Sequence, residues 1–447
     1  MLDNINTTAE KLLESGIVAG APVAVLSENT AEVVVFVLAC WRIGAVVVPL
    51  SSRYPAEKLR CALEAVNCQR VFVSSKFSSV DINAKVDRID DFVDFEGNEI
   101  TPPEFDSLNL NLEADASIIF TSGSSGSPRG VLHTLSNHYF SAAGADRNMP
   151  FEKNDRWLMT LPMYHISGFS LLMRSLLHGG TIVFPRPDES VVEAVEEFNF
   201  THISLVPVQL SQLLGNEKCI DKLQNAKGIL VGGSSVPAGL IKESISRGLP
   251  VYTTYGSTEM ASQITTTGYG DAGKFKGTSG RLLKYRELKV SACGEILVKG
   301  KTLFKGYVSG GSADLPVDAQ GYFHTGDMGR MDDDGNLYVT GRKDLMIVSG
   351  GENIFPEEIE RAIANMSGAL QAVVVPVADT TYGYRSVAFV KMRADQTLDE
   401  KGMRNELGRH IEKFKIPVAF YAWPDIAENS LKPDREAFAR YAAELNK

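Results

Sequence analysis

A segment rich in glycine and hydroxyl side chains at residues 121–130 has the composition of a phosphate-binding loop. It reads TSGSSGSPRG and follows the apolar run of residues 116–120, which predicts a buried strand. Glycines allow backbone N–H groups to turn toward a phosphate, the hydroxyls add donors, and Arg129 keeps its charge at any working pH. The segment therefore predicts a site for the triphosphate of a nucleotide.

Two other interpretations of this segment have to be considered. A P-loop of the Walker type needs Gly-Lys, then Ser or Thr, and then a helix, whereas Pro128 and Arg129 lead into the extended pattern of residues 131–134. The sequence therefore argues against a Walker loop. A solvated linker remains open on composition alone, because segments rich in serine and glycine are often flexible connections.

Three further motifs follow this segment in order along the chain. They are YGSTE at 255–259, TGDMG at 325–329, and GRKD at 341–344 leading to SGGEN at 349–353. Together with the first loop they resemble the motif series of the adenylate-forming enzymes, the superfamily of acyl-CoA synthetases, luciferases and peptide-synthetase adenylation domains. Within it, the local runs most similar to the o-succinylbenzoate–CoA ligases of menaquinone biosynthesis are LPMYHISG at 161–168, LVPVQL at 205–210 and SGGENI at 349–354.

The resemblance implies an ATP-dependent acid–CoA ligase. In such an enzyme a carboxylate attacks the α-phosphate of ATP to form an acyl adenylate, and the thiolate of coenzyme A then displaces AMP. Both steps concentrate negative charge, so the catalyst needs cations and oriented N–H donors more than a nucleophile. The implied ligands are a small carboxylic acid, most closely o-succinylbenzoate, with ATP, Mg²⁺ and coenzyme A. A ligase for another aromatic or medium-chain acid, and an ATP-binding relative without turnover, stay open as alternatives.

By the same resemblance, several residues would bind the nucleotide, each with a structural turn or cap as its alternative. Those that would hold the β- and γ-phosphates are Thr121, Ser122, Gly123, Ser124, Ser125, Gly126 and Arg129. Those that would form the adenine pocket are Gly232, Gly233, Ser234, Ser235, Tyr255 and Gly256. Thr258 would contact the α-phosphate, and Glu259 would hold Mg²⁺, a hard cation that favours oxygen ligands. Asp327 would accept hydrogen bonds from the ribose hydroxyls, with Arg342 nearby.

The C-terminal part of the chain would act as a mobile lid. Lys432 resembles the lysine that reaches the α-phosphate and the carboxylate during adenylation. The lid would pivot near Asp344 and bring Gly350 and Gly351 toward the channel for the pantetheine arm of coenzyme A. The two expected domains are an N-terminal adenylation domain, residues 1–341, and a C-terminal lid domain, residues 342–447.

Three residues are candidates for contact with the acid. His165 opens a helical segment that in relatives borders and gates the acyl pocket, and a buried, hydrogen-bonded histidine is the alternative. Arg174 interrupts the apolar residues 169–177, and a buried guanidinium is costly unless it finds an anion. A second carboxylate on the substrate is one such anion, while a structural salt bridge and a guanidinium that reaches the surface are the other readings. Ser257 is the third candidate.

The elements that would position these residues alternate between two patterns. Helical patterns occur at residues 8–16, 30–43, 56–66, 191–198 and 237–247, and β-branched runs at 23–26, 45–49, 71–73, 181–184, 202–206 and 228–231. This alternation predicts an α/β fold with largely parallel sheets in a large N-terminal domain. After Gly294 the pattern changes to short strands and turns, and beyond Arg342 a small α+β unit begins its first helix at Pro356.

Composition limits the class of protein. A chain of 447 residues with 44% hydrophobic content fills at least two domains, and a net charge of −10 argues against nucleic acid or an anionic membrane as partner. The five cysteines form no CxxC pair and no zinc-binding spacing, so we expect reduced core thiols in a cytoplasmic protein. No export signal or membrane insertion is expected, and a homodimer or larger homo-oligomer stays open.

Overall fold

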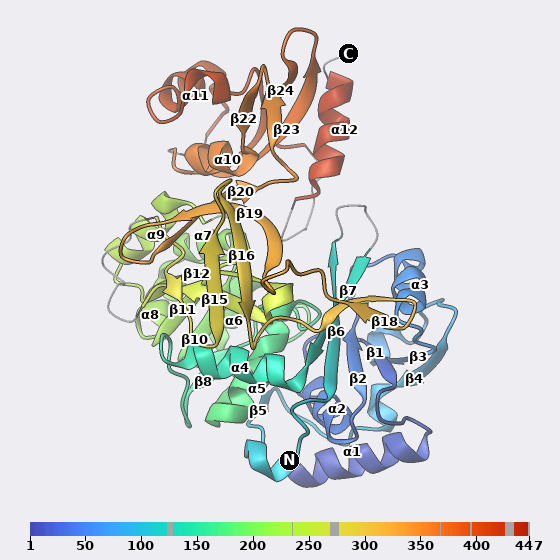
Figure 1. Ribbon diagram of the computed structural model, residues 1–447. Helices are drawn as coiled ribbons and strands as arrows, with labels where there is room; N and C mark the ends of the chain where they lie inside the picture. Colours follow the sequence, from blue (N-terminus) through green and yellow to red (C-terminus); the bar gives the residue numbers. More distant parts are fainter. Residues whose placement is uncertain are drawn as a thin grey trace.

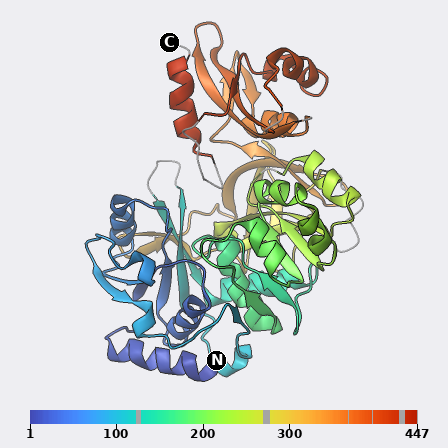
Figure 2. The same ribbon diagram turned by 180° about the vertical axis from the view of Figure 1, so that it is seen from behind.

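The computed structural model describes residues 1–122, 128–234, 236–268, 277–366, 368–393, 396–424 and 433–445. Most of the chain forms a large α/β part, and the C-terminal residues form a smaller unit that stands at one end of it (Figure 1). The view from behind in Figure 2 shows the same separation, with the N-terminus at the opposite end of the molecule from the C-terminal unit. The predicted class, a large domain of βα-built sheets followed by a small α+β domain, is confirmed.

The first sheet is built from βα units at the N-terminus. Strands β1, β2, β3 and β4 run parallel because helices α2 and α3 return the chain to the same end of the sheet. The order across the sheet is β18-β17-β7-β6-β2-β1-β3-β4. The strands are β1 (Pro22–Leu26), β2 (Val46–Pro49), β3 (Arg70–Val73), β4 (Lys85–Arg88), β6 (Asp115–Ser122), β7 (Pro128–Thr134), β17 (Gly306–Ser309) and β18 (Ser312–Asp314). The helices beside them are α1 (Leu2–Glu14), α2 (Ala31–Arg42), α3 (Ala56–Ala65) and α4 (Leu135–Asp146).

The second sheet repeats the βα pattern in the middle of the chain. Its order is β14-β13-β12-β11-β10-β8-β9-β5, with β9, β8, β10, β11 and β12 parallel and β13 turned back antiparallel to β12. The strands are β5 (Glu99–Ile100), β8 (Arg156–Leu158), β9 (Thr181–Val183), β10 (His202–Leu205), β11 (Gly228–Val231), β12 (Val251–Ser257), β13 (Ser262–Thr266) and β14 (Arg281–Leu282). The helices are α5 (Ile166–His178), α6 (Val191–Glu197), α7 (Pro207–Leu214), α8 (Glu217–Gln224) and α9 (Ala238–Ser246).

Two smaller sheets complete the fold. The third, in the order β15-β16-β19-β20, leads by way of β20 to the C-terminal unit, whose sheet has the order β22-β21-β24-β23 with β25 paired to β24. The strands are β15 (Arg286–Val290), β16 (Glu295–Gly300), β19 (Phe323–Met331), β20 (Leu337–Arg342), β21 (Ile347–Ser349), β22 (Glu352–Ile354), β23 (Ala369–Asp379), β24 (Gly383–Met392) and β25 (Phe420–Ala422). The helices of the unit are α10 (Pro356–Ala364), α11 (Glu400–Leu407) and α12 (Arg435–Leu445). Single turns of 3₁₀ helix occur at η1 (Ser75–Phe77), η2 (Ile89–Asp91), η3 (Phe105–Leu108), η4 (Thr258–Met260) and η5 (Lys413–Lys415).

Two details differ from the sequence-based expectations. Helix α1 begins at Leu2 rather than at Thr8, because Ile5, Ala9 and Leu12 pack on one face against the first core although the residues between them are polar. The cysteines are all free, as expected, but Cys61 and Cys293 are exposed rather than in the core. Among the helices that the structure describes, none is long and apolar enough to cross a membrane.

Buried histidines predict how the stability of this fold depends on pH. Burial lowers the pKa of His133 to about 4 and that of His202 to about 4. In the unfolded chain both titrate near 6.5, so as the pH falls below that value the unfolded state binds protons that the folded state cannot. From pH 7.5 to pH 5.5 we expect the free energy of unfolding to drop by about 3 kcal/mol for the pair.

Urea unfolding measured at the two pH values tests this prediction. The exposed His410, which lies beside Glu406 on the surface, serves as the control, because its replacement by glutamine removes a histidine that is not buried. A free energy of unfolding that stays constant over this pH range would contradict the assignment of His133 and His202 as neutral core residues.

Candidate functional site

The carboxyl ends of the parallel strands in the second sheet converge where the sequence motifs lie. Gly232, Gly233 and Ser234 follow β11, and Ser257 ends β12, the next strand in the sheet. A Cβ on Gly232 would come within 2.6 Å of the Cγ2 of Thr254, so the glycine is needed for the close approach of the two strand ends. Ligands of open α/β sheets bind at this edge. Ser235 lies outside the described residues.

A chain of polar contacts links β12 to the third sheet. The Tyr255 hydroxyl donates to Oδ2 of Asp327 at 2.7 Å, and the Arg342 guanidinium donates to Oδ1 of the same carboxylate at 3.4 Å. Arg342 also makes a two-pronged contact with Asp344, at 3.0 Å and 2.9 Å. Tyr255, Asp327 and the pair Arg342 and Asp344, which come from three separate motifs, are therefore brought together at the start of the C-terminal unit.

The pKa values of the residues in this chain of polar contacts follow from burial and from neighbouring charges. Burial, followed by the neighbouring Asp327, raises the pKa of Tyr255 far above its ordinary value, so its hydroxyl stays a donor. Burial likewise raises the pKa of Asp327, against the opposing effect of Tyr255 and Arg342. The contact with Asp344 raises the pKa of Arg342, and the pKa of Asp344 is lowered in return. Each carboxylate oxygen of Asp327 can accept a second hydrogen bond, so the carboxylate keeps acceptor capacity for further donors.

Glu259 lies in η4, directly after β12, and is held by a residue from the first sheet. The Tyr307 hydroxyl donates to Oε1 of Glu259 at 2.8 Å, and the guanidinium of Arg129 lies 5.3 Å from the centre of the Tyr307 ring. The three residues come from η4, β17 and β7, and β17 pairs with β7 in the first sheet. A carboxylate and an always-charged guanidinium thus face the same ring at the junction of the two large sheets.

The backbone around Thr258 is fixed from the opposite side. Nε2 of the buried His133 lies 2.7 Å from the carbonyl oxygen of Thr258, and since the pKa of His133 is low, the neutral ring donates this hydrogen bond. After η4, Ala261 and Ser262 adopt φ values rare for residues with a side chain, 51° and 111°. Such strained backbone is retained where the surrounding structure demands it, and it often marks functional sites.

The predicted phosphate loop connects two paired strands. Thr121 ends β6 together with Ser122, and Arg129 is exposed near the start of β7, with Thr121 opposite Arg129 in the antiparallel pair. Gly123, Ser124, Ser125 and Gly126 lie outside the described residues, as does Lys432. The described ends of this loop therefore lie in β6 and β7, and β7 pairs with β17, which carries Tyr307.

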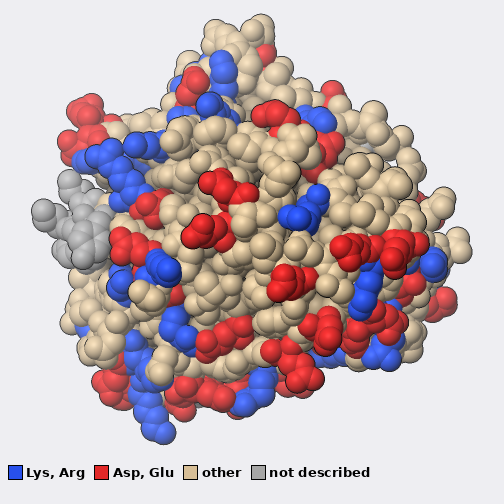
Figure 3. Space-filling model, turned by 90° about the horizontal axis from the view of Figure 1, so that it is seen from below, with Lys and Arg blue, Asp and Glu red and all other residues tan. Residues whose placement is uncertain are grey.

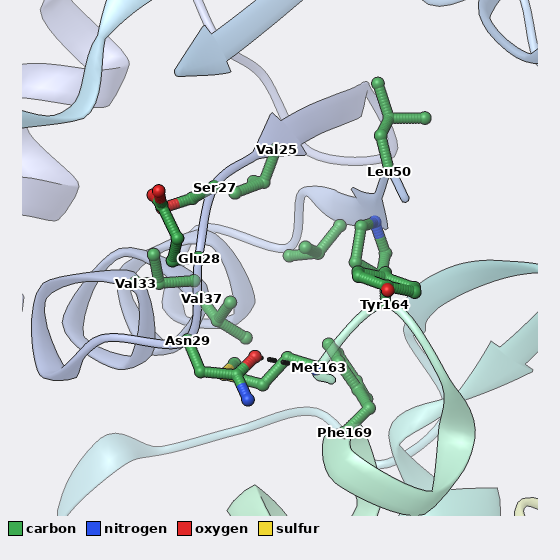
Figure 4. Close-up of a pocket in the computed structure, with 12 residues that line it drawn as sticks. Val25, Ser27, Glu28, Asn29, Val33, Val37, Leu50, Met163, Tyr164 and Phe169 are labelled. Atoms are coloured by element: carbon green, nitrogen blue, oxygen red, sulfur yellow. Dashed lines mark hydrogen bonds between the residues drawn. The ribbon is translucent and has the colours of Figure 1, made fainter. Parts of the chain in front are cut away.

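His165 is the N-cap residue of α5, and its side chain is exposed. This position contradicts the alternative of a buried histidine. The segment before it is clamped by Asn29, which donates to the carbonyl of Leu161 at 2.8 Å and accepts from the backbone N–H of Met163 at 2.8 Å. Figure 4 shows the contact between Asn29 and Met163 beside a cavity of about 20 Å³, which has room for about one water molecule and not for an aromatic acid.

Arg174 lies on α5, two turns beyond His165, and only 5% of it is exposed. Its guanidinium lies over the Trp157 ring, 4.8 Å from the ring centre, and donates through one terminal nitrogen to the side-chain oxygen of Gln263. Its other terminal nitrogen is buried without a hydrogen-bond partner, and no ion pair to a carboxylate is seen among the described residues. The burial of Arg174 contradicts the reading of a guanidinium at the surface, and the reading of a salt bridge finds no partner among the described residues.

The remaining candidates lie in two places, at the end of β12 and in the C-terminal unit. Ser257 ends β12, and its buried hydroxyl lacks a hydrogen-bond partner within the described part of the chain. Gly256 lies so close to Ser262 that an added Cβ would come within 2.1 Å of its carbonyl oxygen. Gly350 and Gly351 form the turn between β21 and β22 of the C-terminal unit, with φ values of +59° and +91°.

Two residues at the site escaped the sequence analysis. Tyr307 holds Glu259, and the only local signal is an aromatic residue after a glycine in the run 304–307. Gln263 holds Arg174 across 89 positions of sequence, and nothing in its neighbourhood indicates that contact. Both pairings arise from tertiary structure alone.

On the face drawn in Figure 3, the described surface is not dominated by charge of one sign. Lysine and arginine side chains are interspersed there with aspartate and glutamate. A nucleic-acid-binding face would gather positive charge in a stripe or patch. Of the cations described above, Arg174 is buried inside the molecule, whereas Arg129 is exposed near the start of β7.

Comparisons with known proteins agree with this geometry. The AMP-binding enzyme family matches residues 1–308, and the C-terminal domain of AMP-binding enzymes matches residues 358–430. The 2-succinylbenzoate–CoA ligase of Bacillus licheniformis is 33% identical over 426 residues, which are 93% of this chain and 88% of that protein. The o-succinylbenzoate CoA synthetase of Bacillus subtilis in complex with the acyl-adenylate intermediate OSB-AMP matches with a TM-score of 0.81 at 28% identity, covering 97% of this chain and 93% of that one. The same synthetase with ATP and magnesium ion matches with a TM-score of 0.80 at 29% identity, over 94% of this chain and 89% of that one. The chain belongs to the AMP-binding enzyme family.

Proposed function

We propose that this protein is an ATP-dependent acid–CoA ligase that converts 2-succinylbenzoate to its CoA thioester by way of an acyl adenylate. The observation that carries the choice of acid is the buried guanidinium of Arg174, which has a free donor and no carboxylate partner among the described residues. A substrate with a second carboxylate supplies the missing anion. The names of the relatives at 33% identity, and of those with similar structures, support the same acid.

Different residues of the chain would bind different parts of the ligands in the adenylation step. Asp327 and Tyr255 hold the nucleoside end, with Arg342 fixing the orientation of the Asp327 carboxylate. Arg129 and the loop after β6 bind the phosphates, so that the negative charge that grows during attack on the α-phosphate is met by cations and N–H donors. His165 at the start of α5 would border the acid, and Thr258, anchored through its backbone by His133, would contact the α-phosphate.

The donor set at Glu259 fits a magnesium ion that arrives with ATP. No group of three or more histidine, cysteine, aspartate or glutamate side chains that could hold a metal ion occurs in the described ranges. Mg²⁺ usually keeps several waters and binds through one or two carboxylates plus substrate phosphates. Glu259 would supply that carboxylate, and the ion would neutralise phosphate charge during transfer.

A pyrophosphate-release assay over a panel of carboxylic acids tests the proposed function. We expect the highest kcat/KM with 2-succinylbenzoate, dependence on ATP, and a CoA thioester as final product. Faster turnover of another aromatic or medium-chain acid would show that this acid, and not 2-succinylbenzoate, is the substrate. Absence of pyrophosphate release with every acid, while ATP still binds, would identify an ATP-binding relative without turnover.

We also propose that residues 342–447 form a lid that pivots near Asp344 between the two half-reactions, carrying Gly350 and Gly351 toward the pantetheine channel. Asp344→Pro fixes φ near −65° and should trap one orientation, so adenylation is expected to persist while thioester formation falls about tenfold or more. The matched control is Asp344→Ala, which removes the same contact with Arg342 but leaves the backbone free. Equal rates for the proline and alanine variants in both half-reactions would show that the pivot lies elsewhere.

A further inference from the structure

A second buried guanidinium lies beside Arg174 and shares a partner with it. Arg286, at the start of β15, is 5% exposed. Its Nε donates to the backbone carbonyl of Gln263 at 2.6 Å, and its terminal nitrogens donate to the carbonyls of Lys284 and Ser141 at 2.8 Å and 3.1 Å. All of these acceptors are neutral. Gln263 therefore joins two buried cations, one through its side chain and one through its backbone.

The charge of this pair is not balanced by the protein. Neither Arg174 nor Arg286 makes an ion pair with a carboxylate within the described ranges, and Asp146 attracts Arg174 only from a longer distance. Burial, and after it the neighbouring charge of Arg174, lowers the pKa of Arg286 to about 9. Buried charges are normally paired, so two unbalanced cations in one place point to an anion that comes from outside.

Gln263 holds the Arg174 guanidinium without supplying a negative charge. Its side-chain nitrogen donates to the hydroxyls of Thr266, at 2.8 Å, and Thr254, at 3.4 Å, so its oxygen is turned toward Arg174. The residue is 4% exposed and lies opposite Gly256 in the β12–β13 pair, next to Ser262, which lies opposite Ser257. A glutamate of the same length would give Arg174 an internal counter-ion, whereas the neutral amide holds the guanidinium without neutralising it.

We infer that Gln263, supported by Arg286, is a specificity-determining positioning residue that holds Arg174 as an unbalanced cation for the second carboxylate of the acid. This inference rests on the proposed function and adds to it a source for the selectivity. Gln263 orients the guanidinium and leaves its free terminal nitrogen for the ligand. Arg286 fixes the backbone of Gln263 and adds a second positive charge that favours an anion over a neutral group.

The test compares two acids that differ only in the second carboxylate, 2-succinylbenzoate and a benzoylpropionate. The quantity measured is the ratio of their kcat/KM values in pyrophosphate release. Gln263→Glu is expected to lower this ratio about tenfold or more, because the new carboxylate competes with the ligand for Arg174. Gln263→Met, which removes the oxygen without adding charge, is expected to lower the ratio by a smaller factor. The matched control is Gln320→Glu, an exposed glutamine that also accepts from a cation, Lys289, and should leave the ratio unchanged.

Thermal unfolding of the ligand-free variants gives a readout that does not depend on turnover. Because Arg174 lacks a counter-ion, Gln263→Glu is expected to melt at a higher temperature than Gln263→Met. A lower melting temperature for the glutamate variant, or an equal loss of activity with both acids, would overturn the inference. If the wild type prefers a different dicarboxylate and Gln263→Glu abolishes that preference, the proposed substrate is wrong and the role of Gln263 stands.

Discussion

Lys432→Ala is expected to abolish ATP-dependent pyrophosphate release while a supplied acyl adenylate is still converted to the thioester. If Lys432 places its ammonium at the α-phosphate, it serves only the step in which charge builds up there. Loss of one positioned electrostatic donor typically costs about 10²–10³-fold in rate. The two half-reactions are measured separately, the first by pyrophosphate release and the second by thioester formation from the isolated adenylate.

The described structure supports a fixed anchor next to this lysine. Pro433 and Asp434 follow it directly, and the Asp434 carboxylate caps α12 by accepting from the backbone N–H groups of Glu436 and Ala437. Arg435 ties the same turn to Glu360 by two contacts of 2.6 Å. The control is Lys401→Ala, which removes an exposed lysine from α11 of the same unit. Equal losses in both half-reactions would show that Lys432 does not serve adenylation alone.

The sequence predicted the framework because local patterns determine it. The buried run Val23–Leu26 forms β1 with only one residue added at its start, and Pro356 begins α10 where the acidic first turn indicated. Helix α1 was placed too late because its first turns are largely polar, and packing of Leu2 and Ile5 against the core stabilises them. Propensity and periodicity describe neighbours along the chain and carry no information on contacts between distant elements.

In the candidate site, too, local patterns identified residues, whereas contacts between distant elements were missed. Residue types and motif order identified Tyr255, Asp327 and Arg342, and the structure joins them in one chain of contacts. The partners of Glu259 and Arg174 could not be predicted, because Tyr307 reaches Glu259 over 48 positions and Gln263 reaches Arg174 over 89. Such pairings depend on the register of β17 against β7 and of β13 against β12, which is fixed by the completed sheets.

Arg174→Leu is expected to lower kcat/KM for 2-succinylbenzoate by about 10²-fold or more, with a much smaller effect on a benzoylpropionate. Truncating one partner of a buried charge-assisted contact typically costs about 2–5 kcal/mol, because the other charge is left without a partner. Leucine keeps the helix propensity of α5 and fills apolar volume beside Trp157, so the fold should persist. In the ligand-free protein the same substitution removes a buried cation that has no counter-ion among the described residues, so its melting temperature should not fall.

The two acids separate a binding role from a structural one for Arg174. If the guanidinium binds the second carboxylate, the loss appears only with the acid that carries it, and kcat/KM for the monocarboxylate stays close to the wild-type value. Arg174→Lys keeps the charge but loses the planar fork that contacts Gln263, so it should fall between the wild type and the leucine variant. An equal loss with both acids, together with a lower melting temperature, would make Arg174 a packing residue and remove the main support for a dicarboxylate substrate.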